Sequence, residues 1–334
     1  MNKPLRVVMV GAGGVAHRHV SVLSGLDGVQ VAAVADPDAE AAGRLAQLCG
    51  AGAFTSAAAA LDAVRADAVY VCVPPFAHGP AERLVLDRGL PLFVEKPVAL
   101  DVATADDIAR RVAASGVVTG TGYHWRYLDV VERARTLLTD SPASLAAGYW
   151  LDKRPPVGWW AHLDRSGGQV VEQLTHVLDL ARLLFGEATE VYAAGRRVGR
   201  TGAGGDPMSD VGDIDDATAA TVRFASGTVA TFAATSLLKA KHHAGLHAFG
   251  PGRVLEITET SLAVDEGTGP LVHEAVADAK VALDADFVAV VRGEREQTRA
   301  PYGQAVRSHH LACAVARSAA EGVPVRLPTY GRSG

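Results

Sequence analysis

The sequence predicts an α/β protein in which an N-terminal, doubly wound parallel sheet is followed by a second domain built mainly from antiparallel strands. A short apolar strand near the N-terminus runs directly into a glycine-rich turn, and strand-like and helix-like segments then alternate. Such alternation is typical of a parallel sheet. After residue 186 apolar and polar residues alternate, which is typical of half-buried antiparallel strands. We therefore expect domains at 1–122 and 123–334, the last helix being free to pack back on the first domain.

The composition is that of an ordinary globular protein. The chain has 334 residues, a formal net charge of -5 and no dense basic run, so nothing indicates nucleic acid or a membrane surface as a partner. Its three cysteines lie far apart and form no disulfide framework or metal-ligand spacing. The N-terminus lacks the apolar segment of a signal peptide, and no apolar run reaches membrane-spanning length. These observations predict a cytoplasmic location.

The strand Leu5–Val10 is followed by "GAGGVA" and by a helix from about Val15 to Ser24, which is the order of a dinucleotide-binding unit. The first glycine allows a tight turn, the second lets a pyrophosphate approach the backbone, and a small residue in third place lets the helix pack closely. Phosphates bind at the free amides of such a helix N-terminus. The candidate residues are Gly11, Gly13, Gly14, Val15 and Ala16.

A second strand ends at Asp36, 25 residues after Gly11 (36 − 11). An acid close to this spacing hydrogen-bonds the ribose hydroxyls of NAD and repels the 2′-phosphate of NADP. No arginine follows in "DPD", so NAD is favoured over NADP. The alternative is that Asp36 only caps the helix that comes after it.

Further candidates stand at the ends of the later strands, where ligands of doubly wound sheets bind. "CVPP" and "EKP" end two of these strands, and His78 opens the next helix. Lys96 precedes a proline, which favours extended backbone, and its place at a strand end indicates a functional role. The candidates here are Pro74, Pro75, His78, Glu95 and Lys96.

"GGQVVEQLTHVLDL", which begins at Gly167, predicts a largely buried helix because its apolar residues recur at helical spacing. Glu172 and His176 are four residues apart and should share one face. Burying ionisable groups is costly unless they are paired or used. They are therefore either a hydrogen-bonded core pair or part of a reactive site.

The stretches "GAGGVAHRH", "VADPD", "CVPPFAH", "EKP" and "GGQVVEQLTHVLDLARLLFGE" together resemble the Gfo/Idh/MocA oxidoreductase family along nearly the whole chain. The resemblance implies a Rossmann domain with a C-terminal α/β domain on a large open sheet. It also implies an NAD(P)-dependent oxidoreductase acting on a CH–OH group. The substrate would be a secondary alcohol or ketone of a sugar, cyclitol or glycoside.

The resemblance also implies roles for single residues. Lys96 matches the family's lysine close to the nicotinamide and the substrate hydroxyl, and His176 matches its acid/base histidine. Glu172 stands where inositol dehydrogenases have an aspartate, so a catalytic or an orienting role is open. Arg126 and Asp179 match substrate-side residues. Some relatives use a tyrosine as acid/base, but this helix contains none.

The remaining substrate candidates are Trp159, Trp160 and Lys153, in a loop before this helix. Tryptophan rings often pack on sugars, but they also anchor loops. No metal is expected. The glycine- and aspartate-rich segment from Gly199 predicts a solvated loop, and the adjacent His242 and His243 point to opposite sides of a strand. Helices are predicted near Ala279–Val291 and Tyr302–Glu321.

The family likeness implies a homodimer or homotetramer, because the open face of a large sheet is often covered by another subunit. It also leaves two other functions open. Some relatives retain NAD and cleave glycosides through transient oxidation of a ring carbon. A few relatives are non-catalytic sensors of dinucleotides or sugars.

Overall fold

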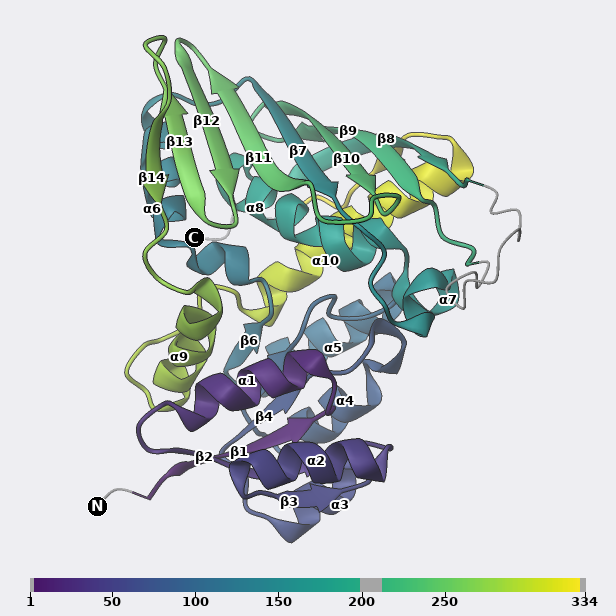
Figure 1. Ribbon diagram of the computed structural model, residues 1–334, viewed down its shortest axis with the longest axis vertical. Helices are drawn as coiled ribbons and strands as arrows, with labels where there is room; N and C mark the ends of the chain where they lie inside the picture. Colours follow the sequence, from purple (N-terminus) through teal and green to yellow (C-terminus); the bar gives the residue numbers. More distant parts are fainter. Residues whose placement is uncertain (1–2, 199–211, 331–334) are drawn as a thin grey trace. The chain divides into compact units, whose positions relative to one another are not determined.

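The computed structural model describes residues 3–198 and 212–330, which form two compact units (Figure 1). The first unit comprises Met1–Tyr123 and Lys280–Val306, and the second comprises His124–Ala279 and Arg307–Gly334. The predicted second domain, 123–334, is therefore divided, because Lys280–Val306 groups with the first unit. Most of the glycine- and aspartate-rich segment predicted as a loop lies outside the described residues.

The first unit contains a six-stranded sheet in the order β3-β2-β1-β4-β5-β6, and every pair of neighbours is parallel. This confirms the predicted doubly wound sheet. The strand order reverses between β1 and β4, and ligands of such sheets bind beyond the carboxyl ends at that point. The strands are β1 (Leu5–Val10), β2 (Val29–Ala35), β3 (Gly52–Phe54), β4 (Ala68–Val71), β5 (Leu92–Val94) and β6 (Thr119–Thr121).

The helices of the first unit begin and end at residues suited to those positions. Asp38 accepts hydrogen bonds from two first-turn amides of α2, and Gly50 ends that helix in the left-handed conformation. Helices α1 and α2 lie in front of the sheet in Figure 1, with α9 beside α1. The helices are α1 (Gly14–Ser24), α2 (Ala39–Cys49), α3 (Ala57–Ala63), α4 (Pro80–Asp87), α5 (Val102–Ser115) and α9 (Ala279–Val291).

The second unit is built on a nine-stranded sheet in the order β14-β13-β12-β11-β7-β10-β9-β8-β15. The pair β7 and β10 is parallel and the other neighbours are antiparallel, which confirms the mainly antiparallel sheet. The strands are β7 (Leu145–Leu151), β8 (Ala188–Arg196), β9 (Ala217–Phe224), β10 (Val229–Thr235), β11 (His243–Gly250), β12 (Arg253–Thr258), β13 (Ser261–Asp265), β14 (Leu271–Glu274) and β15 (Val325–Arg326).

Helices α6 (Asp129–Asp140), α8 (Thr175–Phe185) and α10 (Tyr302–Glu321) lie on one face of this sheet, and α7 (Leu163–Ser166) precedes α8 (Figure 1). Helix α8 packs directly on β7. A Cβ atom at Gly148 would lie 2.5 Å from the Phe232 ring and 2.8 Å from Val177 of α8. The missing side chain therefore sets how closely α8 approaches the strands. No helix in the described residues is long and apolar enough to cross a membrane.

Candidate active site

The glycine turn of the first unit has the space and the free amides that a dinucleotide needs. Gly11 has φ +97°, and a Cβ atom there would lie 2.2 Å from the Cys72 carbonyl oxygen, so only glycine fits between β1 and β4. A Cβ atom at Gly13 or Gly14 would meet nothing within 4 Å. Within the described residues, the N-cap of α1, Gly13, provides no side-chain hydrogen bond to the first turn. The residues present therefore fit a pyrophosphate bound by the first amides of α1.

Asp36 follows β2 and accepts a hydrogen bond at 2.8 Å from the backbone N–H of Ala12, in the glycine turn. It also accepts one from the backbone N–H of Asp38 at 2.9 Å. The residue that caps α2 is Asp38, not Asp36. Asp38 therefore has the capping role that was the alternative for Asp36. The Asp36 carboxylate instead binds the backbone of the glycine turn.

The remaining cofactor-binding candidates of the first unit differ in their exposure to solvent. Val15, at the start of α1, is 45% exposed, while Ala16 is fully buried beneath it. His78 is buried, and its Nδ1 donates a 2.5 Å hydrogen bond to Glu82 of α4. Pro75 is also buried, whereas Pro74 is partly exposed.

Glu95 is buried at the centre of a charged network just before Lys96. Its Oε1 accepts hydrogen bonds from Arg18 and His19 of α1, both at 2.9 Å. Its Oε2 accepts the backbone N–H of Lys96 at 2.9 Å. A Cβ atom at Gly122 would lie 2.3 Å from Oε2, so glycine leaves room for the carboxylate. Glu95 therefore supports the backbone of Lys96 from inside the unit.

The network continues to α9 through His19, whose Nδ1 lies 2.7 Å from Oδ1 of the buried Asp284. Burial lowers the pKa of His19, but Asp284 and Glu95 outweigh it, so the pKa is raised. Burial raises the pKa of Glu95, yet His19, Arg18 and Lys96 hold the pKa at about 2. Sequence reasoning did not single out Arg18, His19 or Asp284. "HRH" in the glycine-turn helix was the one available signal.

In the second unit, His176 is buried on α8 among aromatic rings. Its ring centroid lies 4.6 Å from that of His124, 5.6 Å from Trp150 and 6.5 Å from Trp125. Trp150 and Trp125 lie nearly parallel to the imidazole, whereas His124 meets it edge-on. The ammonium of Lys241 lies 4.3 Å from the centre of the Trp150 ring. The imidazole of His176 is thus set among aromatic rings, one of which also contacts the Lys241 ammonium.

Glu172 lies in a π-helical turn, Val170–Leu174, that leads into α8. Such turns are rare and often occur at functional sites. The carboxylate Oε2 accepts a 2.9 Å hydrogen bond from the indole N–H of Trp160. Trp160 is almost fully buried, so the contact anchors the preceding loop to this turn. Trp159 is partly exposed and Lys153 is exposed.

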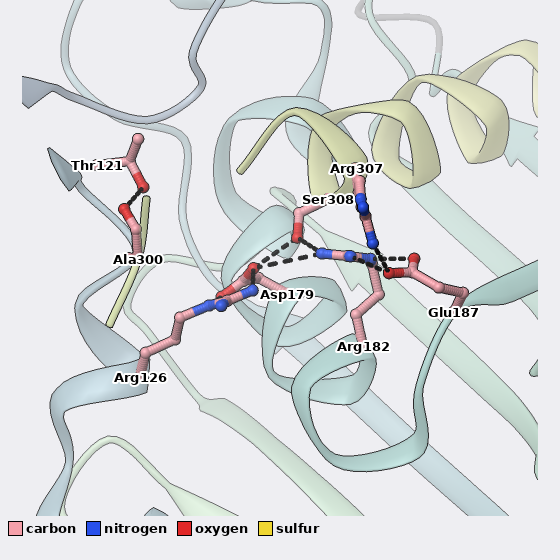
Figure 2. A network of polar contacts seen from close by, with 8 residues as sticks. All are labelled: Thr121, Arg126, Asp179, Arg182, Glu187, Ala300, Arg307 and Ser308. Atoms are coloured by element: carbon pink, nitrogen blue, oxygen red, sulfur yellow. Dashed lines mark hydrogen bonds and ion pairs between the residues drawn. The ribbon is translucent and has the colours of Figure 1, made fainter. Parts of the chain in front are cut away.

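Arg126 and Asp179, two predicted substrate residues, bind each other (Figure 2). The guanidinium donates two hydrogen bonds of 2.7 Å to the carboxylate, and both side chains are buried. Ser308 of α10 donates a third at 2.5 Å and accepts one from Arg182 at 2.6 Å. This pairing favours a role in holding α8 in place over direct contact with a substrate.

We predict that Glu95→Gln changes how stability depends on pH. Because the pKa of Glu95 falls from 4.5 to about 2 on folding, its stabilisation is complete above pH 4.5 and is lost toward pH 2. A shift of this size corresponds to about 3 kcal/mol. The difference in unfolding free energy between the wild type and Glu95→Gln should therefore shrink steadily as pH falls. Urea unfolding at several pH values measures this difference. A difference that does not change with pH would contradict stabilisation of the ionised Glu95 by its neighbours.

We predict that Asp179→Asn lowers the free energy of unfolding by about 3–5 kcal/mol, because it leaves a buried guanidinium without its counter-charge. Glu132→Gln is the matched control, since its pair with Arg135 is solvent-exposed. It should change stability by less than about 1 kcal/mol. Chemical denaturation measures the free energy of unfolding of each variant. An equal decrease in the two variants would refute the structural role of the buried pair of Arg126 and Asp179.

Comparisons with known proteins agree with this geometry. The model of an oxidoreductase family with an NAD-binding Rossmann fold matches residues 5–123, and the GFO/IDH/MocA C-terminal domain matches residues 143–256. The solved structure of a levoglucosan dehydrogenase in complex with NADH has a TM-score of 0.86 over 98% of this chain and 100% of that one, at 17% identity. At that identity the likeness concerns the fold.

Two curated relatives match parts of the chain. Inositol 2-dehydrogenase of Mycolicibacterium gilvum is 32% identical over 186 residues, which cover 55% of this chain and 53% of the relative. D-apiose dehydrogenase of Paraburkholderia graminis is 26% identical over 215 residues, covering 61% and 56%. The chain thus spans about half the length of these relatives. With both domain models matched in order, the chain belongs to the Gfo/Idh/MocA oxidoreductase family, and residues 5–123 form that family's NAD-binding Rossmann domain.

Proposed function

We propose that the protein is an NAD-dependent dehydrogenase that moves a hydride between the nicotinamide and a secondary alcohol or ketone of a sugar, cyclitol or glycoside. The observation that carries the proposal is the glycine turn, open above Gly13 and Gly14, with the Asp36 carboxylate bound to its backbone. The substrate class is supported by the relatives named inositol 2-dehydrogenase and D-apiose dehydrogenase.

In the proposed reaction His176 is the acid/base and Lys96 is its cationic partner. Bound NAD supplies the hydride acceptor. An imidazole has an unperturbed pKa near 6.5 and so can take the hydroxyl proton near neutral pH. The aromatic rings around His176 exclude water, which strengthens electrostatic interactions in the site. The ammonium of Lys96 stabilises the charge that develops on the substrate oxygen.

Glu172 and the tryptophans take positioning roles in this proposal. Because Glu172 accepts the indole N–H of the buried Trp160, the same carboxylate fixes the loop and the turn before His176. Trp159 is the more accessible ring and so the better platform for the apolar face of a sugar. The exposed Lys153 is a further contact for substrate hydroxyls or an acidic group, whereas the Lys241 ammonium over Trp150 is already ion-paired with Glu259.

We also propose a cytoplasmic homodimer or homotetramer. The face of the nine-stranded sheet opposite α6 and α8 carries no helix in the described residues, and all three cysteines are free thiols. Light scattering on the purified protein measures the assembly, and a monomer at micromolar concentration would exclude it.

We predict that Asp36→Ser shifts the cofactor preference toward NADP. Removing the carboxylate abolishes repulsion of a 2′-phosphate, so the ratio of kcat/KM for NADP to that for NAD should rise at least about tenfold. Asp38→Ser is the control, because serine still caps α2 and keeps the backbone N–H that Asp38 donates to Asp36. An unchanged ratio in Asp36→Ser would place ribose recognition elsewhere.

We predict that His176→Ala lowers kcat about 10²–10⁴-fold, the usual contribution of a general base. Lys96→Ala should cost a similar factor through the loss of charge stabilisation. The assay is NADH formation from NAD with separate inositols, hexoses, amino sugars, uronic acids and glycosides. His273→Ala, on β14, is the control histidine and should retain full activity.

The same assay separates the proposal from its alternatives. Activity that survives both His176→Ala and Lys96→Ala would contradict the assigned roles. Tightly retained NAD with glycoside cleavage and no net NADH would indicate the glycoside-cleaving function. NAD binding without turnover of any substrate would indicate a sensor.

A further inference from the structure

The open face of the second sheet brings two histidines and a glutamate together. The sequence predicted no metal site here, because the adjacent His242 and His243 point to opposite sides of a strand. His242 lies before β11, but His243 and His247 are four residues apart on that strand and so point to the same face. Glu256 on β12 is paired directly opposite His247. The three ligand atoms all lie within 4.8 Å of one another.

The distances between these atoms suit a metal ion better than hydrogen bonds. The same carboxylate oxygen, Oε1 of Glu256, lies 3.5 Å from Nε2 of His247 and 3.8 Å from Nε2 of His243. Both separations exceed the ~2.7–3.2 Å of ordinary N–H···O hydrogen bonds. Two ligands of a tetrahedral zinc ion, bonded at about 2.0–2.1 Å, lie about 3.4 Å apart. Small side-chain movements would bring all three atoms into such a geometry.

Gly245 makes this convergence possible. It lies between the two histidines on the same face, and a Cβ atom there would be 2.9 Å from Nε2 of His243. The His243 ring therefore lies over the space that a side chain at Gly245 would occupy. Glycine within a strand often marks such a close approach. Tyr149 of β7 packs against both imidazoles, with centroid distances of 5.8 Å to each.

The cluster is separate from the surroundings of His176. Tyr149 and Trp150 are consecutive on β7 and so point to opposite faces of the sheet. Tyr149 contacts His243 and His247, whereas Trp150 contacts His176. All three ligand side chains are partly accessible, with 25–37% of their surface exposed. In the single chain, a cation can therefore reach the cluster without entering the proposed catalytic site.

We propose that His243, His247 and Glu256 form a binding site for a late first-row divalent cation of the zinc type. Two imidazoles and one carboxylate are ligands that suit such ions. Three protein ligands leave at least one coordination position for water. Because the site ties β11 to β12 and binds only the folded chain, the cation stabilises the second unit.

The test uses the untagged full-length protein after removal of metals with a chelator, and Zn²⁺ as the probe. Competition with a chromophoric chelator should give one zinc per chain. His247→Ala, His243→Ala and Glu256→Gln should each weaken binding at least about tenfold. His242→Ala is the matched control and should bind zinc like the wild type. Zinc should also raise the melting temperature of the wild type and of His242→Ala, but not that of His247→Ala.

Gly245→Ala provides a second variant that keeps all three ligands. The added methyl group should displace the His243 ring and weaken zinc binding, while melting curves without metal report whether the variant is folded. Co²⁺ should give the intense visible bands of a four- or five-coordinate site, and these should fade in Glu256→Gln. Absence of zinc binding, or binding that persists equally in His243→Ala and His247→Ala, would overturn the proposal.

Discussion

The first unit depends on the burial of one ionised carboxylate. Glu95 has almost no contact with water, and an uncompensated charge in such surroundings would be too costly to keep. Arg18 and His19 of α1 and the backbone N–H of Lys96 donate hydrogen bonds to this carboxylate. The other ring nitrogen of His19 binds the carboxylate of Asp284. The helix that begins at the glycine turn, the backbone of Lys96 and the distant α9 are therefore fixed by one set of charges. Burial beside Glu95 and Asp284 also raises the pKa of Cys72 well above its usual value, so this thiol is unreactive.

The second unit also contains a buried, charge-paired carboxylate, that of Asp179 on α8. Asp179 accepts three hydrogen bonds inside the unit, and Arg182 continues the network to Glu187 and Arg307 (Figure 2). Helices α8 and α10 are thereby joined through polar groups that include Asp179, one helical turn after His176 on α8. In both units a candidate reactive side chain is thus supported by a neighbouring acid whose own charge is already satisfied. A rigid support of this kind is what precise placement of a catalytic group requires.

Much of the fold could be predicted because its signals are local. The apolar strand before "GAGG" and the two segments that form α9 and α10 are runs of contiguous residues, and the predicted helices Ala279–Val291 and Tyr302–Glu321 coincide with the observed ones. Strands β3, β14 and β15 have three, four and two residues, too few to show a pattern. The pairing of His19 with Asp284 joins residues 265 positions apart, and no periodicity reports such a contact. The ion pair of Arg126 with Asp179 was hidden for the same reason, and the substrate role expected for both residues came from the family resemblance, which does not report such a contact.

The π-helical turn before α8 has a consequence for how the site can change during evolution. A turn of this type accommodates one residue more than the α-helix around it, and each residue of an α-helix advances by about 100°. Loss of Gln173 or Leu174, which lie between Glu172 and His176, would restore a regular helix and rotate Glu172 by about that angle around the axis relative to His176. The side chains of α8 that face the sheet would keep their register. The loss of one codon would therefore alter which groups accompany the histidine while the core below stays intact.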